Sequence, residues 1–504
     1  MKKRKRTQLV LEFLSPEFQF NLVNLTNEDC HKKALKYYEK KKGISILDEI
    51  EILFHKAKLE PSEEIVNELL GIANRIVQFN YDHRRLIDVA QELFVLDDKY
   101  KAPILIVLGN LFSAIGASED AEKIFLNALE IYKELAKKYY KIYLPYIATT
   151  QKNLGTLYID LKRFEDAEKI YTDALSSYKD IEKQYYNAHS SDFHSKGIEE
   201  RTYIDDLKAY NEILKRFYDI YLPEESSISS DYRNVGIDID LLENIKDGSI
   251  ESIDNYKTLA KLYYDTYLID IAKTHSSLGL IYYELIKYED AERMHREALK
   301  IYRKIVDHYP NQVLPELVLT LLDLGDLYAS LDKFEKAEPL FIEALNISKR
   351  LAEENPDVYY HNVAFIQESL GTVYSRLQKY EEAEKMYIEA LKIFKYLSQN
   401  DPKAYLHRVA EVQNNLGNLL LILGNLDEAE LYLNKAFKKD PANIDILYNL
   451  ACLESLRNNI SKAIELLTKV IDLDRNYIKR AEKDKKLENI KDLIEFKELM
   501  SDQS

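Results

Sequence analysis

The residues whose types and spacing come closest to a metal site are His189, Asp192 and His194. Imidazole and carboxylate groups are among the ligands that zinc prefers in proteins. These three residues, however, stand in a run rich in serine, aspartate and asparagine, which is typical of an exposed loop. We therefore interpret them as a solvated surface and expect no metal there.

A second candidate begins at Asp238, where the chain starts like a calcium-binding loop. Asp238 and Asp240 have the spacing of the first two ligands, but Glu243 stands where such a loop needs glycine for its sharp turn. The sequence also lacks a phosphate-binding GxxxxGKS or GxxxxGKT, an HExxH and a GxSxG motif. We therefore predict no catalytic residues, no cofactor and no enzymatic activity.

Charge and composition limit the partners that the chain is expected to bind. The net charge of −16 opposes nonspecific binding to nucleic acid and to anionic membranes. The basic start MKKRKR could contact nucleic acid or serve as an address, although a solvated terminus is the simpler interpretation. The two cysteines, Cys30 and Cys452, fit a reducing compartment. Because no apolar run is long enough for a membrane span or a signal peptide, we expect a cytoplasmic protein.

The elements that must position any binding surface are helical hairpins, and Ser369–Phe394 shows their pattern most clearly. Gly371 is followed by Ala383 and Ala390, twelve and nineteen residues later, with large apolar residues at helical spacing between them. Small residues at these places let two helix backbones approach closely. The spacing recurs, with substitutions in the last copy, at Gly109/Ala121/Ala128, Gly155/Ala167/Ala174, Gly279/Ala291/Ala298, Gly325/Ala337/Ala344, Gly417/Ala429/Ala436 and Ala451/Ala463/Val470.

This order of glycine and alanines resembles the tetratricopeptide repeat. The resemblance implies an all-α solenoid, a right-handed superhelix of helix-turn-helix repeats. Pro310, Pro356 and Pro402 each follow a repeat glycine by 31 residues, so we expect second helices of about 20 residues. The segment Lys333–Leu345, with Pro339 early in the second helix, looks like the longer repeats of the kinesin light chain type.

The breaks in the repeat period predict five regions. Gly155 and Gly279 are 124 residues apart, which indicates an inserted stretch with loops and a degenerate repeat. The alternation of Phe18, Phe20 and Leu22 predicts a short strand near the N-terminus. The regions are 1–100, helical and interpreted as a cap or as degenerate repeats; 101–186, repeats one and two; 187–258, the insertion; 259–475, repeats three to seven; and 476–504, a C-terminal capping helix.

The resemblance also implies which residues face a partner. In tetratricopeptide proteins the first helices line a concave surface, and residues two before and one after the repeat glycine point into it. Asparagine there can hydrogen-bond the backbone of a peptide, although such residues can also be merely exposed helix positions. The predicted peptide-binding groove contains Asn110, Asn153, Thr156, Asp323, Asp326, Asn415, Asn418 and Asn449.

Function is predicted from this groove. We expect a protein-protein interaction scaffold that binds a peptide or helix of another protein, with no small-molecule substrate. Acidic groove positions outnumber basic ones, which favours a basic or polar partner segment. One alternative is a ligand-sensing or peptide-sensing regulator whose residues 1–100 act on a target. A second alternative, an enzyme within 187–258, is disfavoured because so few residues rarely build an active site. The counted acidic residues are Asp160, Glu284, Asp323, Asp326, Glu368, Glu411 and Asp445, against Lys152, Lys273 and Arg376.

Overall fold

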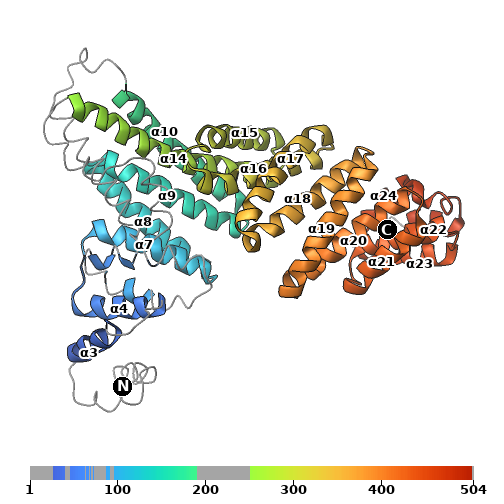
Figure 1. Cartoon of the computed structure of the whole chain (residues 1–504), viewed down its shortest axis with the longest axis horizontal. Coiled ribbons are helices and arrows are strands. Elements are labelled where there is room, and N and C mark those ends of the chain that lie inside the picture. The colour runs from blue at the N-terminus through green and yellow to red at the C-terminus, as the bar shows by residue number, and fades with distance from the viewer. Residues whose placement is uncertain are drawn as a thin grey trace. The chain divides into compact units, whose positions relative to one another are not determined.

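The structure is a computed structural model that describes residues 27–39, 46–62, parts of 64–96, 97–189 and 250–501. It divides into two compact units, Met1–Ile286 and Lys287–Ser504. Within each unit, helices that follow one another along the chain pack side by side as hairpins (Figure 1). The described chain is therefore an all-α solenoid, as the sequence predicts. None of its described helices combines the length and apolar character needed to cross a membrane.

The first unit holds the N-terminal helices and the first two repeats. Its N-terminal core includes Leu53, Leu69 and Leu93, which cluster with Leu111 of the first repeat. This shared core agrees with an all-helical N-terminal region, although the predicted strand at 18–22 and residues 190–249 lie outside the described residues. The helices are α3 (Asn27–Glu39), α4 (Ile46–Leu59), α7 (Asp98–Ala114), α8 (Ser118–Lys138), α9 (Tyr140–Asp160), α10 (Phe164–His189) and α14 (Ile250–Glu284).

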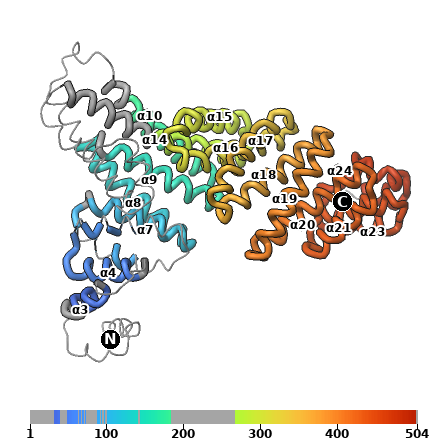
Figure 2. The backbone as a smooth tube through the Cα atoms, viewed as in Figure 1, coloured from blue at the N-terminus to red at the C-terminus, as the bar shows by residue number. Residues whose placement is uncertain are grey.

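The second unit contains the longer run of repeats. Pro310, Pro356 and Pro402 each occupy the start of a helix, where a missing N–H costs nothing, and each of these helices is 21 residues long. Figure 2 follows the alternation of helix and turn. The helices are α15 (Tyr288–Ile305), α16 (Pro310–Ser330), α17 (Phe334–Glu354), α18 (Pro356–Arg376), α19 (Tyr380–Asn400), α20 (Pro402–Ile422), α21 (Leu426–Lys439), α22 (Ile444–Leu456) and α23 (Ile460–Leu473).

The small residues of the repeat lie at the closest helix contacts. Ala383 and Ala390 are both 0% exposed. A Cβ atom added at Gly371 on α18 would lie 2.7 Å from Cδ1 of Tyr387 on α19, closer than real side chains approach. The ring of Tyr387 therefore packs directly on the α18 backbone, which explains why the repeat needs glycine there.

The turn between the two helices of each hairpin has a constant backbone conformation that the sequence analysis missed. The seventh residue after the repeat glycine, or after Ala451 in the last repeat, has a positive φ in every copy, and five of the seven residues are not glycine. The signal in the sequence is glycine at two of these positions, asparagine at a third and aspartate at a fourth. The residues are Gly116, Lys162, Ile286, Asp332, Gln378, Gly424 and Asn458.

The C-terminal tail covers the last hairpins, but it is broken where the sequence predicts one capping helix. It consists of α24 (Tyr477–Lys483), the 3₁₀ turn η3 (Lys485–Leu487) and α25 (Ile494–Ser501). The side chain of Asp484 accepts a hydrogen bond from the backbone N–H of Lys486 and starts the 3₁₀ turn. Leu487, Ile490 and Phe496 then join the core of the final repeats.

Candidate functional site

The first helices of the second unit carry a stripe of acidic side chains. We define the acidic face as Asp323 and Asp326 of α16, Glu368 of α18 and Glu411 of α20. Relative to the repeat glycine, these residues stand six, three or two positions before it, or one after it. Residues three and four apart share one side of a helix, so the four carboxyl groups occupy the same stripe of their helices.

The two aspartates of α16 have unusually high pKa values. Burial among the neighbouring helices, reinforced by the charge of Asp326, raises the pKa of Asp323 from 3.8 to about 7. Burial raises the pKa of Asp326 to about 6, and water still reaches this side chain, which is exposed. No described cation contributes to either pKa. A positive charge from another molecule would therefore stabilise the ionised forms of these carboxyl groups, because the described residues supply none.

Glu368 on α18 continues this face. Burial and the nearby charge of Glu411 raise its pKa to about 7, against the opposing effects of Arg408 and a hydrogen bond from Asn415. The amide nitrogen of Asn415 donates to Glu368 Oε1 at 3.1 Å, while Oε2 is buried without a partner. Arg408 forms its ion pair with Glu411 at 2.9 Å and lies over the Phe365 ring. Glu368 thus lacks a cation of its own among the described residues.

At the C-terminal end, two predicted groove residues, Asn418 and Asn449, form hydrogen bonds with other residues of the chain. Asn449 is only 2% exposed and donates a hydrogen bond to Asn414 at 2.9 Å. Asn418 accepts a hydrogen bond at 2.5 Å from Lys486, which arrives from the tail. Sequence reasoning missed Lys486 because it lies 68 residues further along the chain. The acidic face lies apart from these C-terminal contacts, on α16, α18 and the middle of α20.

The predicted groove residues of the first unit contact other residues of that unit, in the same repeat or in the neighbouring one. The amide of Asn153 lies 3.4 Å from the carbonyl oxygen of Asn110, and the Thr156 hydroxyl lies 2.9 Å from that of Tyr171. Lys152 forms an ion pair with Asp270 of α14. The predicted groove residues Asn110, Asn153 and Thr156 and the basic residue Lys152 are therefore already engaged within the first unit.

The metal-binding and calcium-binding candidates of the sequence lie almost entirely outside the described residues. His189 ends α10, whereas Asp192, His194 and the loop at Asp238 lie outside the described residues. Among the residues that the structure does describe, no group of histidine, cysteine and acidic side chains is arranged to hold a metal ion. Of the acidic residues counted from the sequence, Asp445 is already paired with Arg480 at 2.7 Å.

Models of known protein families match several stretches of the chain. Tetratricopeptide-repeat models match residues 147–182 and 271–310, then 316–396 and 362–442, and finally 420–482. The chain is a tetratricopeptide-repeat protein, with long repeats that resemble the kinesin light chain type. Such repeats support a role in protein interaction. No curated protein sequence matches the chain.

Solved structures with a similar fold share little sequence with the chain. A signal transduction ATPase with a tetratricopeptide-repeat sensor from Pyrococcus horikoshii has 15% identity over 92% of this chain and 55% of its own, with a TM-score of 0.49. BtubC from P. vanneervenii has 21% identity over 49% of this chain and 90% of its own, with a TM-score of 0.34. At these values we draw no conclusion about function.

Proposed function

We propose that the protein is a non-enzymatic, cytoplasmic scaffold that binds a peptide or helix of another protein on the acidic face of its second unit. The bound segment carries lysine or arginine. The observation that carries this proposal is the stripe of carboxyl groups at Asp323, Asp326 and Glu368, which form no ion pair with the described residues and of which Glu368 Oε2 is buried without a partner; their raised pKa values agree with it. A cation beside these groups would stabilise their ionised forms and offset the cost of their burial.

Two lysines of the chain itself support a basic partner. Lys486 reaches Asn418 in the same stripe of α20 and lies 3.5 Å from Asp484. Lys152 pairs with Asp270 on the corresponding helices of the first unit. Both contacts indicate that an ammonium group fits between neighbouring first helices. A lysine from another chain can be held in the same way over α16 and α18.

The expected contribution of each charge is modest. Exposed ion pairs contribute roughly 0–1 kcal/mol, so the acidic face should act mainly by speeding association and by rejecting acidic segments. Specific affinity must then come from hydrogen bonds to Asn415 and from apolar contacts such as Phe365. Added salt should weaken association because it screens the acidic face.

The experiment begins with affinity capture and mass spectrometry to identify a partner. Association rates are then measured over a range of salt concentrations for the native protein and for Asp323→Asn/Asp326→Asn. We expect the double variant to associate more slowly and to depend less on salt. Glu381→Gln/Glu382→Gln on α19 removes the same formal charge away from the acidic face and should change both quantities less. Association that ignores both salt and the α16 substitutions would refute the proposal.

A further inference from the structure

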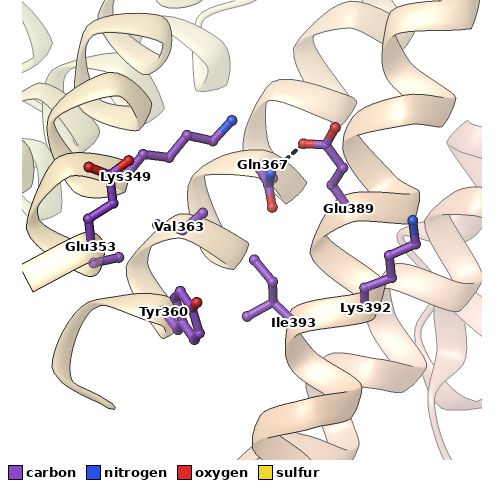
Figure 3. A pocket seen from close by; sticks show the side chains of 9 residues that line it. Lys349, Glu353, Tyr360, Val363, Gln367, Glu389, Lys392 and Ile393 are labelled. Carbon is purple, nitrogen blue, oxygen red and sulfur yellow. Dashed lines mark hydrogen bonds between the residues drawn. The ribbon is translucent and has the colours of Figure 1, made fainter. Parts of the chain in front are cut away.

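The second helices of neighbouring hairpins in the second unit carry matched charges. On α15 and α17 the residue five after the second alanine of the repeat is basic, and on α17 and α19 the residue one before it is acidic. Arg303 on α15 forms an ion pair with Glu343 on α17 at 2.7 Å. The same positions hold Lys349 on α17 and Glu389 on α19, which line one surface depression (Figure 3). The repeat thus places a cation on one helix opposite a carboxylate on the next.

This matching of charges fails between α19 and α21. The cation of α19 is Lys395, but the residue one before Ala436 on α21 is Lys435 instead of a carboxylate. Two more lysines, Lys438 and Lys439, stand at the end of α21. Burial lowers the pKa of Lys439, and the positive charges of the other three lysines lower it further. Four positive charges therefore gather where the two preceding pairs of helices place a cation opposite a carboxylate.

No carboxylate of the described chain neutralises these lysines. Lys395, Lys435 and Lys438 are exposed, and none of them forms an ion pair with a described residue. Lys439 donates a hydrogen bond at 3.1 Å to the side-chain carbonyl oxygen of Gln413 on α20, which carries no charge. Lysines in the last turn of a helix stabilise its dipole, but only Lys438 and Lys439 stand in such a turn. The helix dipole therefore does not explain Lys395 and Lys435.

The first half of α20 extends past the end of α21, beside these lysines. The helices from α16 to α20 are each 21 residues long, whereas α21 has 14 residues and ends at Lys439. α20 begins at Pro402, 11 residues before the Gln413 that contacts Lys439. About 16 Å of α20 therefore runs beyond α21. Compared with α17 and α19, α21 is shorter by about two helical turns.

This part of α20 presents an exposed apolar side chain. Leu406 stands seven residues before Gln413, so both lie on one side of α20, and Leu406 is 44% exposed. Its counterpart on α18 is Tyr360, which lines the depression of Figure 3 together with Lys349 of the preceding helix. By the same geometry Lys395, the counterpart of Lys349, flanks Leu406. The lysines and Leu406 thus form one continuous surface.

We propose that this surface, the basic step, binds an acidic amphipathic helix of another protein. The basic step consists of Lys395, Leu406, Lys435, Lys438 and Lys439. The bound helix lies along α20 where α21 is two turns shorter than its counterparts, packs an apolar side chain on Leu406 and directs carboxylates to the lysines. These carboxylates offset the mutual repulsion of the lysines, and this complementarity selects the partner. The exposed Leu406 favours a protein over a nucleic acid or an anionic membrane, which the net charge of −16 also opposes.

The basic step and the acidic face are separate sites. Glu411 of the acidic face and Gln413, which contacts Lys439, are two residues apart, so they point about 200° from one another around α20. The two sites also attract partners of opposite charge. Binding at the basic step therefore does not rest on the proposed function, and Asp323→Asn/Asp326→Asn should leave it unchanged.

The test uses the whole chain and a fluorescein-labelled helical peptide of glutamate, alanine and leucine, with the leucines on one side. Fluorescence anisotropy measures its affinity. We expect saturable binding that weakens as salt is added, because salt screens the exposed lysines. A second peptide has the same composition in an order that spreads the leucines around the helix. It should bind about fivefold more weakly, because it cannot direct leucine and glutamate to separate parts of the basic step.

Three variants separate the charge of the basic step from its apolar contact. Lys435→Glu places a carboxylate opposite Lys395, as in the preceding repeats, so it should raise the melting temperature while weakening peptide binding about five- to tenfold. Leu406→Gln keeps the net charge and should reduce the preference for the amphipathic peptide over its reordered form. Lys385→Glu makes the same change of charge on α19, ten residues before Lys395, and should affect binding much less. Circular dichroism verifies that each variant is folded.

Several results would overturn the proposal. One is the absence of saturable binding of the amphipathic peptide, and another is equal binding by the native protein and Lys435→Glu. Tighter binding of single-stranded DNA or of phosphatidylserine vesicles than of the peptide, if Lys435→Glu removes it, would assign the basic step to a nucleic acid or a membrane. Self-association of the native protein in analytical ultracentrifugation, if Lys435→Glu abolishes it, would make a second copy of the chain the occupant.

Discussion

At the level of single residues, the carboxyl groups of α16 and α18 behave unlike ordinary surface acids. A carboxyl whose pKa is raised in the folded state prefers to keep its proton there, so ionising it works against folding. Asp323 and Glu368 both have raised pKa values of about 7. Ionising these groups on the acidic face therefore costs stability at neutral pH, and a cation bound beside them would offset this cost.

The first prediction follows from the sign of the shift at Asp323. Below about pH 4 both the folded and unfolded states hold the proton, so the native protein and Asp323→Asn should be equally stable. As pH rises from about 4 to about 7, the unfolded state of the native protein loses this proton before the folded state does, so only the native protein accumulates the penalty, which is complete above about pH 7. We expect Asp323→Asn to be more stable at pH 8 by roughly 1–2 kcal/mol once solvent access is allowed for. Thermal unfolding at a series of pH values measures the difference, and a stabilisation that does not grow with pH would contradict the assignment.

At the scale of helices and hairpins, the repeat spacing predicts most of the fold. The twelve and seven residue steps locate the alanines at the hairpin contact, and the prolines mark the starts of α16, α18 and α20. The side chains that depart from the repeat could not be predicted in the same way. Ser348 and Ile393 read as ordinary helix residues in the sequence. Only the packing shows that the hydroxyl of Ser348 is buried without a partner and that Gln367, beside Ile393, has a carbonyl oxygen without a donor.

A second prediction tests the close contact at Gly371. A Cβ atom there meets the rigid ring of Tyr387 at 2.7 Å, whereas at Gly417 it meets Cδ2 and Cγ of Leu433, an aliphatic side chain that can change rotamer, at 2.7 Å. Ala451 already occupies the equivalent position in the last repeat, where its counterpart across the hairpin is Leu467. We therefore expect Gly371→Ala to lower stability by about 1–3 kcal/mol. The matched variant Gly417→Ala should change stability little, and equal effects in chemical denaturation would show that the ring is not the cause.

A third prediction concerns the turn at Gln378. This residue has φ of 61°, a left-handed conformation that glycine adopts without strain, and the same turn position is Gly424 in the next repeat. Gln378→Gly should stabilise the protein by about 0.5–1 kcal/mol, since the relieved strain exceeds the added freedom of the unfolded chain. The melting temperature measures this gain. Gln378→Ala serves as the control, because alanine keeps the strain, and it should give no gain.

At the scale of the whole molecule, the two units use the same repeat differently. In the first unit, the polar stripe is closed by Lys152 with Asp270 and by Asn153 with Asn110. In the second unit, Lys486 of the tail contacts Asn418, whereas Asp323, Asp326 and Glu368 form no ion pair with any described residue. The sequence predicts an acidic excess along the array, but it could not locate that excess, because the pairing cations lie many residues away along the chain.

The pH dependence of partner binding follows from this distribution of charge. Lysine and arginine stay protonated between about pH 6 and pH 8, so any change in their attraction to the acidic face must come from the protein. Asp323 and Glu368, with pKa values of about 7, are mostly neutral at the lower pH and mostly ionised at the higher one. We expect affinity for a basic partner segment to rise about three- to tenfold over this interval, and we expect binding to release protons.

Asp323→Asn/Glu368→Gln should flatten this dependence of affinity on pH. Asp445→Asn should leave it intact, because Asp445 is already paired with Arg480. Titration calorimetry in buffers of different ionisation enthalpy measures both affinity and proton release. A partner that binds equally well at both pH values, with no proton released, would place its contacts away from the acidic face.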